Sequence, residues 1–288
     1  MNIIDDLMFY LGFDFVRYAI VVGVLIALCA SLIGVPLVLK RYSFIGEGLS
    51  HLAFAVLAFA IVINMTNNLL IIMPATVLVS VLLLGRGNKV KIKGDAAVAM
   101  LSVSALAIGY FLINMYSSSG NVSADVCTSL FGALSILTLK MTDVWISISV
   151  SIAVVVIFIV FYNKIFAVTF DAPFMEATGA RPEIYNLLFA AIIGIVIALS
   201  MRLVGALLTS ALIIFPAISA MRLFKTYSSV TVCAVIIAIV CALSGILIAV
   251  LFGTPVGSTI VMANMAVFSG FCLIDLVSKG GMITHEQE

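Results

Sequence analysis

The chain has 288 residues, of which 64% are hydrophobic and only 9% charged, whereas an ordinary soluble domain has roughly 25% charged residues. Its 14 basic and 13 acidic residues are too few to cover a soluble protein of this length, so most of the outer surface must face lipid. This composition excludes a soluble globular fold and predicts an all-α, polytopic membrane protein. The formal net charge of +1, without a concentrated basic face, argues against nucleic acid as a partner.

Apolar stretches separated by charged or turn residues predict about eight to nine transmembrane helices, since one crossing needs about 20 residues. The predicted spans are residues 15–39, 50–64, 68–85, 95–116, 142–162, 184–201, 203–221, 229–252 and 257–277. A shorter apolar stretch, residues 126–139, is too short to cross and predicts a re-entrant or surface-lying segment. We therefore expect an extracellular or periplasmic segment at 1–14, one transmembrane domain at 15–277 and a cytosolic tail at 278–288.

The basic residues predict the orientation of these helices. If the N-terminus is outside and nine spans alternate, eleven of the 14 basic residues are cytoplasmic, and only Arg17, Lys140 and Arg202 fall on the other side. The positive-inside rule favours this arrangement over its inverse. The sequence thus predicts a multi-pass protein of the cell (inner) membrane with a cytosolic C-terminus.

The longest internal polar loop, residues 164–183, carries the signals of a short helix. Asp171 can cap it, Pro173 falls in its first turn, and Gly179 can end it. Its length forbids spanning, and its apolar side chains need a surface to lie on. Two interpretations follow: a helical loop that rests on its own bundle, or a docking helix for a cytosolic partner.

Glu47 and His51 are the most informative ionisable pair, because such groups are costly in a membrane and functional by default. Residues four apart share a helix face, so both side chains can point at one divalent ion. Ten residues from Arg41 to His51, counted as helix, put the imidazole about 15 Å past the basic edge, roughly halfway through a ~30 Å hydrocarbon core. Gly46 and Gly48 permit an irregular start of this helix. The alternative is that Glu47 and His51 only satisfy each other or bond to backbone.

Other polar residues are candidates for lining a pathway. Thr209 and Ser210 share a span with Pro216, which kinks the helix and frees a carbonyl. Their hydroxyls either contact a hydrated path or bond within the bundle. Asp125 lies near the predicted outer interface, as a vestibule residue or as a solvated loop charge.

No standard enzyme constellation occurs in the sequence. It contains no GxxxxGK[ST], HExxH or GxSxG pattern. We expect no catalytic residue in the chain, and if transport is driven by ATP, the ATPase must be a separate polypeptide.

The string LKRYSFIGEGLSHLAFAVLAFA resembles the end of the first helix and the start of the second in permeases of metal-ion ABC importers, the zinc/manganese/iron type-3 permease family. In that family a basic pair and an aromatic precede Gly-acid and then Leu-Ser-His or Leu-Ala-His. Three further stretches resemble the family in the same order: DVCTSLFGALSILTLKMTDV, MRLVGALLTSALIIFPAISAMRLF and GTPVGSTIVM. The resemblance covers most of residues 15–277.

The resemblance implies a homodimer of permeases around one pathway, two cytosolic ATP-binding subunits and an extracellular metal-binding protein. It implies no stably bound cofactor, only a transported zinc, manganese or iron ion. Glu47 and His51 match the family's acid and His, and so are its expected metal contacts. The family's coupling helix corresponds to residues 170–181, where Asp171, Phe174, Glu176 and Gly179 are the implied coupling positions.

Two departures bear on the metal. The acid is usually Asp in the family and is Glu47 here. Many zinc-type members have a His in the segment matching AVAMLSVSALAIGY, where this chain has Ser102 and Ser104. One nitrogen ligand fewer weakens the case for zinc and leaves manganese or iron.

We therefore predict the permease subunit of an ATP-driven divalent-metal importer that works by alternating access. The first alternative is an ion-coupled secondary transporter in which Glu47 carries protons. The second is an ABC permease for a siderophore or cobalamin. A membrane metalloenzyme is a distant third, since one His and one Glu are too few ligands.

Overall fold

The computed structural model describes residues 8–63, 69–85, 94–116 and 139–285. These residues form helices joined by short connections, with no β-strand among them, which confirms the all-α prediction. The helices are α2 (Asp14–Leu39), α3 (Ile45–Val62), α4 (Leu69–Gly85), α5 (Gly94–Tyr116), α7 (Met141–Val160), α8 (Tyr162–Phe170), α9 (Ala172–Ala177), α10 (Pro182–Val204), α11 (Ala206–Leu223), α12 (Tyr227–Phe252) and α13 (Val256–His285).

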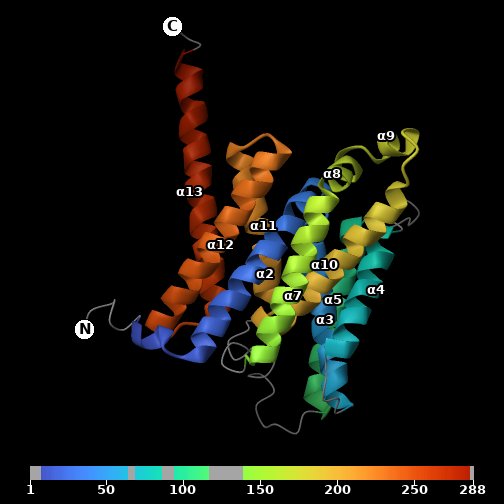
Figure 1. The fold of residues 1–288 in the computed structure, drawn as a ribbon, viewed down its shortest axis with the longest axis vertical. Coiled ribbons are helices and arrows are strands. Elements are labelled where there is room, and N and C mark those ends of the chain that lie inside the picture. The colour runs from blue at the N-terminus through green and yellow to red at the C-terminus, as the bar shows by residue number, and fades with distance from the viewer. Residues whose placement is uncertain (1–7, 64–68, 86–93, 117–138, 286–288) are drawn as a thin grey trace.

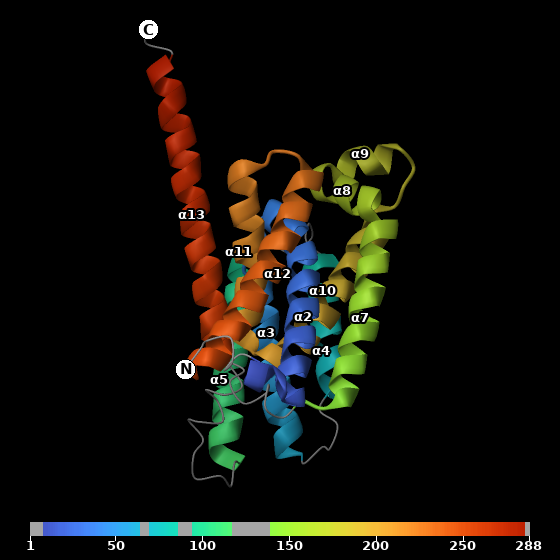
Figure 2. The same ribbon diagram turned by 60° about the vertical axis from the view of Figure 1, so that its left-hand side comes forward.

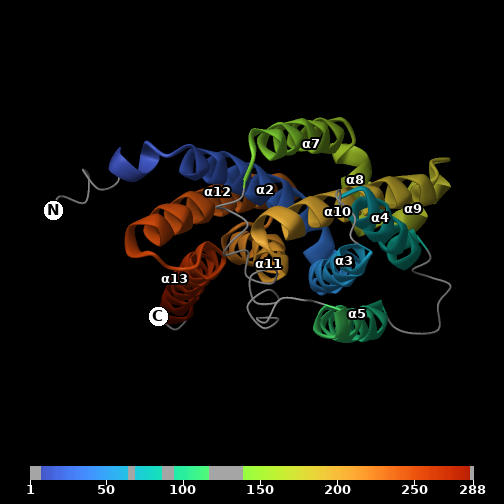
Figure 3. The ribbon, with the colours of Figure 1, turned by 90° about the horizontal axis from the view of Figure 1, so that it is seen from below.

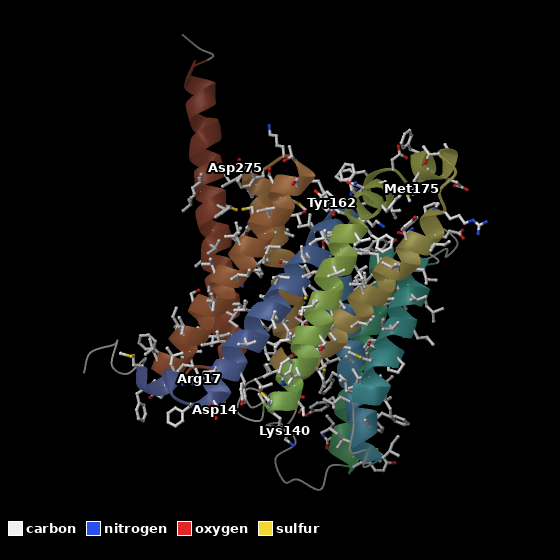
Figure 4. All side chains as sticks on the ribbon, viewed as in Figure 1. Asp14, Arg17, Lys140, Tyr162, Met175 and Asp275 are labelled. Atoms are coloured by element: carbon white, nitrogen blue, oxygen red, sulfur yellow. The ribbon has the colours of Figure 1, made fainter. Side chains whose placement is uncertain are left out.

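Each predicted span corresponds to one long helix of the described chain, and successive long helices run in opposite directions (Figure 1). Eight of them are long and apolar enough to cross a membrane, and α4 is the shorter one. The predicted segment 126–139 lies outside the described residues except for Leu139. Asp14, Arg17 and Lys140 lie at one end of the bundle, and Met175 and Asp275 lie at the other (Figure 4). These two ends are the ones that the charge pattern separates.

The helix α3 lies inside the bundle, and this location positions the candidate site. Seen end-on (Figure 3), α2 lies between α12 and α7, while α10 and α11 form the next row. On the far side of that row, α3 packs against α4, α10 and α11, and α5 covers its outer face. The first turns of α3 are therefore surrounded by protein on several sides.

Hydroxyl groups fasten α4 to α10. Ser80 Oγ donates to the Ala190 carbonyl at 2.7 Å. Thr76 Oγ1 lies 2.8 Å from the Ile72 carbonyl of its own helix and 3.2 Å from the Gly194 carbonyl of α10. A Cβ on Gly194 would lie only 2.7 Å from the Val77 Cα, so the glycine permits this close approach. Small residues and hydroxyl-to-carbonyl bonds of this kind hold helices together in lipid, where the hydrophobic effect between helices is absent.

The last helix is longer than the sequence predicts. The span was expected to end at residue 277, but α13 continues to His285, inside the segment predicted as a tail. Its final turns rise beyond the other helices, at the end of the bundle where α8 and α9 lie (Figure 2). The apolar run ends near residue 277, but the helix continues through Lys279, Gly280 and Gly281. The length of the apolar run therefore marked the predicted span and not the end of the helix.

Candidate functional site

A tight turn between α2 and α3 positions Glu47. The N–H of Arg41 donates to the Val38 carbonyl and the N–H of Tyr42 donates to the Leu37 carbonyl, both at 3.0 Å, which is the Schellman pattern of a helix C-terminus. Arg41 has φ 61°, a left-handed conformation that costs a non-glycine residue about 1–2 kcal/mol. The turn is thus a defined structure that fixes where α3 begins.

The helix α3 begins at Ile45, so the assumption of continuous helix from Arg41 is wrong. His51 lies six residues into α3, or about 9 Å along its axis. Gly46 and Gly48 are regular helical residues rather than an irregular start. A Cβ on Gly46 would lie 3.1 Å from Ile213 Cδ1 of α11, and one on Gly48 would lie 2.8 Å from Val98 Cγ1 of α5. The two glycines therefore let both neighbours approach α3 on either side of Glu47.

The Glu47 and His51 side chains face each other on α3. His51 Nε2 lies 3.7 Å from Glu47 Oε1, too far for a hydrogen bond. Two ligands that each lie about 2.1 Å from one ion are separated by about 3.0–3.6 Å for bond angles between 90° and 120°. A small rotation of Glu47 would therefore let both side chains hold the same ion.

Burial differs sharply between the two residues. The His51 side chain is 8% exposed and that of Glu47 is 44% exposed. The other imidazole nitrogen of His51, Nδ1, is buried and has no hydrogen-bond partner. Within the described parts of the chain, no group of three or more His, Cys, Asp and Glu side chains is placed to hold a metal. The charged side chains at this site thus supply two ligands.

A cavity of about 180 Å³ lies beside Glu47, between α3 and α5. Its lining residues are Phe44, Glu47, Val98, Ala99, Ser102 and Val103. Ser102 is buried, whereas Ser104 is exposed. Glu47 and Ser102 are 55 positions apart in the sequence, and this spacing gives no sign that they share a cavity. The packing of α5 on α3 adds this hydroxyl to the site.

The predicted lining residues of α11 bond to their own helix. The Thr209 hydroxyl is buried and donates to the Gly205 carbonyl at 2.8 Å, and the Ser210 hydroxyl donates to the Leu207 carbonyl at 3.0 Å. The backbone of Ser210 lies close to Gly46, so it borders the start of α3. Asp125, the third such candidate, lies outside the described residues. A pathway role for these three residues stays a prediction.

The short helix predicted in the polar loop is α9. The Asp171 side chain accepts a hydrogen bond from the Phe174 N–H at 2.9 Å, and Pro173 lies in the first turn. Gly179, with φ 82°, ends the helix, and its N–H donates to the Glu176 carbonyl at 2.9 Å. The predicted cap and stop are therefore confirmed.

The two apolar side chains of α9 point in different directions. Met175 is 3% exposed and anchors the helix, whereas Phe174 is 65% exposed. Asp171 and Glu176 are exposed as well. The helix thus rests on the bundle through Met175 and presents Phe174 between two acidic residues, at the bundle end seen in Figure 4.

Helix α8, which connects α7 to α9, was not predicted from the sequence. Its rings of Phe166 and Phe170 pack around Tyr227 of α12, with centroids 5.1 and 6.1 Å from that ring, and the Tyr162 ring lies 5.3 Å from it. Aromatic residues at positions 162, 166 and 170 share one helix face, which was the available signal. These contacts tie the segment before α9 to the start of α12.

Comparisons with known proteins agree with this architecture. The sequence profile of the ABC 3 transport family matches residues 12–274. The chain belongs to this family and is a multi-pass membrane protein without catalytic activity of its own.

Two relatives and one solved structure illustrate the similarity. The chain is 28% identical to the manganese import system permease protein ScaB of Streptococcus gordonii, over 89% of this chain and 90% of that protein. It is 25% identical to the high-affinity zinc uptake system membrane protein ZnuB of Haemophilus influenzae, over 89% of this chain and 96% of that protein. The solved structure of PsaBC from Streptococcus pneumoniae in complex with Fab is similar with a TM-score of 0.78 and 25% identity, over 93% of this chain and 94% of that one.

The opposite burial of neighbouring residues in α9 yields a first prediction. Met175→Asp places an unpaired charge in a buried position and should lower the stability of the permease by about 3 kcal/mol or more. Phe174→Asp should leave the thermal unfolding midpoint in detergent at the wild-type value, because this side chain is exposed. Equal destabilisation by both substitutions would contradict the described orientation of α9.

Proposed function

We propose that the chain is the permease subunit of an ATP-driven importer that moves a divalent metal ion, manganese or zinc, by alternating access. The observation that carries this proposal is the facing pair of Glu47 and His51, 3.7 Å apart on an enclosed helix. Family membership and the metals named for ScaB and ZnuB support it. The chain performs no bond chemistry, and its task is to replace part of the ion's hydration shell and to move rigid helices.

The assembly that we propose contains two copies of this chain, two cytosolic ATP-binding subunits and an extracellular metal-binding protein. The end of the bundle with α9 and the C-terminus faces the cytosol, as the charge pattern favours. The ion enters from the end where Asp14 and Lys140 lie, meets Glu47 and His51, and leaves inward when movement of the ATP-binding subunits reaches the bundle through α9. Exposed Phe174 and the acidic residues beside it are the contacts proposed for docking.

We propose manganese as the preferred ion of this subunit. Glutamate oxygens and a serine hydroxyl are hard ligands, and oxygen donors suit Mn²⁺, whereas zinc is commonly bound by nitrogen and sulfur. The cavity beside Glu47 is lined by the Ser102 hydroxyl, an oxygen donor. A histidine nitrogen at this position would favour zinc instead. A single imidazole, His51, supplies the one nitrogen of the proposed site.

The metal pair is tested by His51→Ala at unchanged membrane abundance. Loss of one of two ligands should reduce Mn²⁺ uptake by at least about tenfold, since 1.4 kcal/mol of binding corresponds to that factor. Uptake of radioactive Mn²⁺ into liposomes that contain the assembled complex measures this. Normal uptake by His51→Ala refutes the assignment, and robust proton-driven uptake by the chain alone supports a secondary transporter instead. Loss of free-ion uptake in Glu47→Gln argues against a siderophore or cobalamin substrate.

A role of the cavity in Mn²⁺ uptake is tested by placing leucine at each of two serine positions of α5. Ser102→Leu fills space beside Glu47 and should suppress Mn²⁺ uptake, while Ser104→Leu adds the same side chain to an exposed position and should leave uptake unchanged. Ser102→Ala keeps the space but removes the hydroxyl, so it separates obstruction from loss of an oxygen ligand. Equal uptake by the two leucine variants would contradict a role for this cavity.

Docking is tested by Phe174→Asp in cells that co-express the ATP-binding subunits. Because an aspartate cannot fill an apolar pocket, we expect these subunits to be lost when the permease is purified. Phe224→Asp, which changes an exposed phenylalanine in the connection between α11 and α12, is the matched control and should retain them. Retention by Phe174→Asp would exclude α9 as the main docking element.

A further inference from the structure

One polar contact joins the turn before the metal pair to the helix that follows α9. Lys40, the last residue before Arg41 in the α2–α3 turn, donates from Nζ to Asn186 Oδ1 of α10 at 2.7 Å. The same ammonium lies 5.8 Å from the centroid of the Phe189 ring, also on α10. Lys40 is thus bound to α10 through a hydrogen bond and a cation–π contact.

Burial lowers the pKa of the Lys40 ammonium to about 8, so the charged form still predominates at neutral pH. A hydrogen bond from a charged donor is stronger than a neutral one. The charge lies at a partly buried position, where a neutral side chain would pack at lower cost. This cost indicates that the contact has a task besides packing.

The positions of the two partners suggest that task. Asn186 lies in the first turns of α10, which begins at Pro182, five residues after α9 ends at Ala177. Lys40 precedes Glu47 by seven residues and is joined to α3 by the defined turn around Arg41. If α9 is displaced and shifts the start of α10, Asn186 moves and pulls on Lys40 through their hydrogen bond. The backbone of Lys40 continues through the turn into α3, the helix that carries both proposed metal contacts.

We propose that the Lys40–Asn186 contact is a positioning contact that couples movement of the α9–α10 segment to the orientation of Glu47 and His51. In this proposal Lys40 and Asn186 act on the ion only through the helices that they join. They act by holding α3 and the start of α10 together as one unit, so that ATP-driven movement reorients the ion pair. This inference rests on the proposed importer function and adds the residues that transmit the movement.

The test uses the complete complex, with ATP-binding subunits and metal-binding protein, in liposomes. Lys40→Met keeps the apolar stem and removes the ammonium, and Asn186→Leu removes the acceptor. Both should retain ATP hydrolysis but transport fewer Mn²⁺ ions per ATP, by about tenfold for loss of a charge-assisted hydrogen bond. The double variant should be no worse than either single one, because both remove the same contact.

Conservative variants and a basic residue outside the α2–α3 turn distinguish a coupling role from a purely structural one. Lys40→Arg and Asn186→Asp each keep a donor and an acceptor, so they should restore most of the ions transported per ATP. Lys225→Met removes an exposed basic group in the connection between α11 and α12 and should behave as wild type. A structural role alone would lower assembly and hydrolysis together and would leave the ratio of ions to ATP unchanged.

Two different failures are distinguishable in this experiment. If the wild-type complex shows no ATP-dependent Mn²⁺ uptake, the importer function itself is wrong. If the wild type couples uptake to hydrolysis and both Lys40→Met and Asn186→Leu keep the wild-type ratio, the coupling role is wrong and the importer function stands. If one variant fails to assemble, the other supplies the same comparison from the opposite helix.

Discussion

The hydrocarbon core of a membrane offers no hydrogen-bond partners, so the polar groups of the bundle must form their hydrogen bonds within the protein. Many hydroxyls donate a hydrogen bond to a backbone carbonyl in the preceding helical turn. Ser50 donates to the Gly46 carbonyl at 2.6 Å, and Ser200 donates to the Val196 carbonyl at 2.7 Å. His51 Nδ1 has no hydrogen-bond partner, and it shares that state with buried atoms of Ser219, Tyr227 and Asn264. An unpaired atom is therefore no site by itself. What distinguishes His51 is the carboxylate one turn away, at a separation that suits a shared ion.

The same constraint explains why α3 can carry such a pair. Gly46 and Gly48 remove side chains on both flanks of Glu47, so that α11 and α5 approach the helix backbone closely. On α2, a Cβ at Gly34 would overlap the Ile213 carbonyl, which brings α11 close to α2 as well. The resulting enclosure buries His51, and Glu47 keeps an opening toward the cavity at Ser102. Close packing therefore creates both the dry side and the accessible side of the site.

The long helices of the described chain were predictable, because the length of an apolar run reports a membrane span directly. The cap at Asp171 and the stop at Gly179 were predictable because each acts through local chemistry between residues close in the sequence. Three features of the site and its surroundings were not predictable. Arg41 adopts a left-handed backbone conformation that glycine usually adopts at the end of a helix. Because no glycine marks this turn, α3 was predicted to be continuous from Arg41. The contact of Ser102 with the Glu47 cavity and that of Lys40 with Asn186 depend on helix packing, which a uniformly apolar sequence does not encode as a readable period.

The unequal exposure of the two proposed ligands gives the site a direction. Glu47 lines the cavity and is about half exposed, whereas His51 lies behind it and is nearly buried. In the proposed site, an ion in the cavity would meet the Glu47 carboxylate first, and a rotation of that carboxylate would bring the ion to the imidazole. Conduction requires binding that is favourable enough for entry and weak enough for exit. A tight structural site would complete four ligands, while two charged-residue ligands with a hydroxyl nearby leave coordination positions for water. Because both proposed ligands lie on α3, a reorientation of that helix would move them together. It would change which side of the bundle the held ion faces, and not the distance between the two ligands.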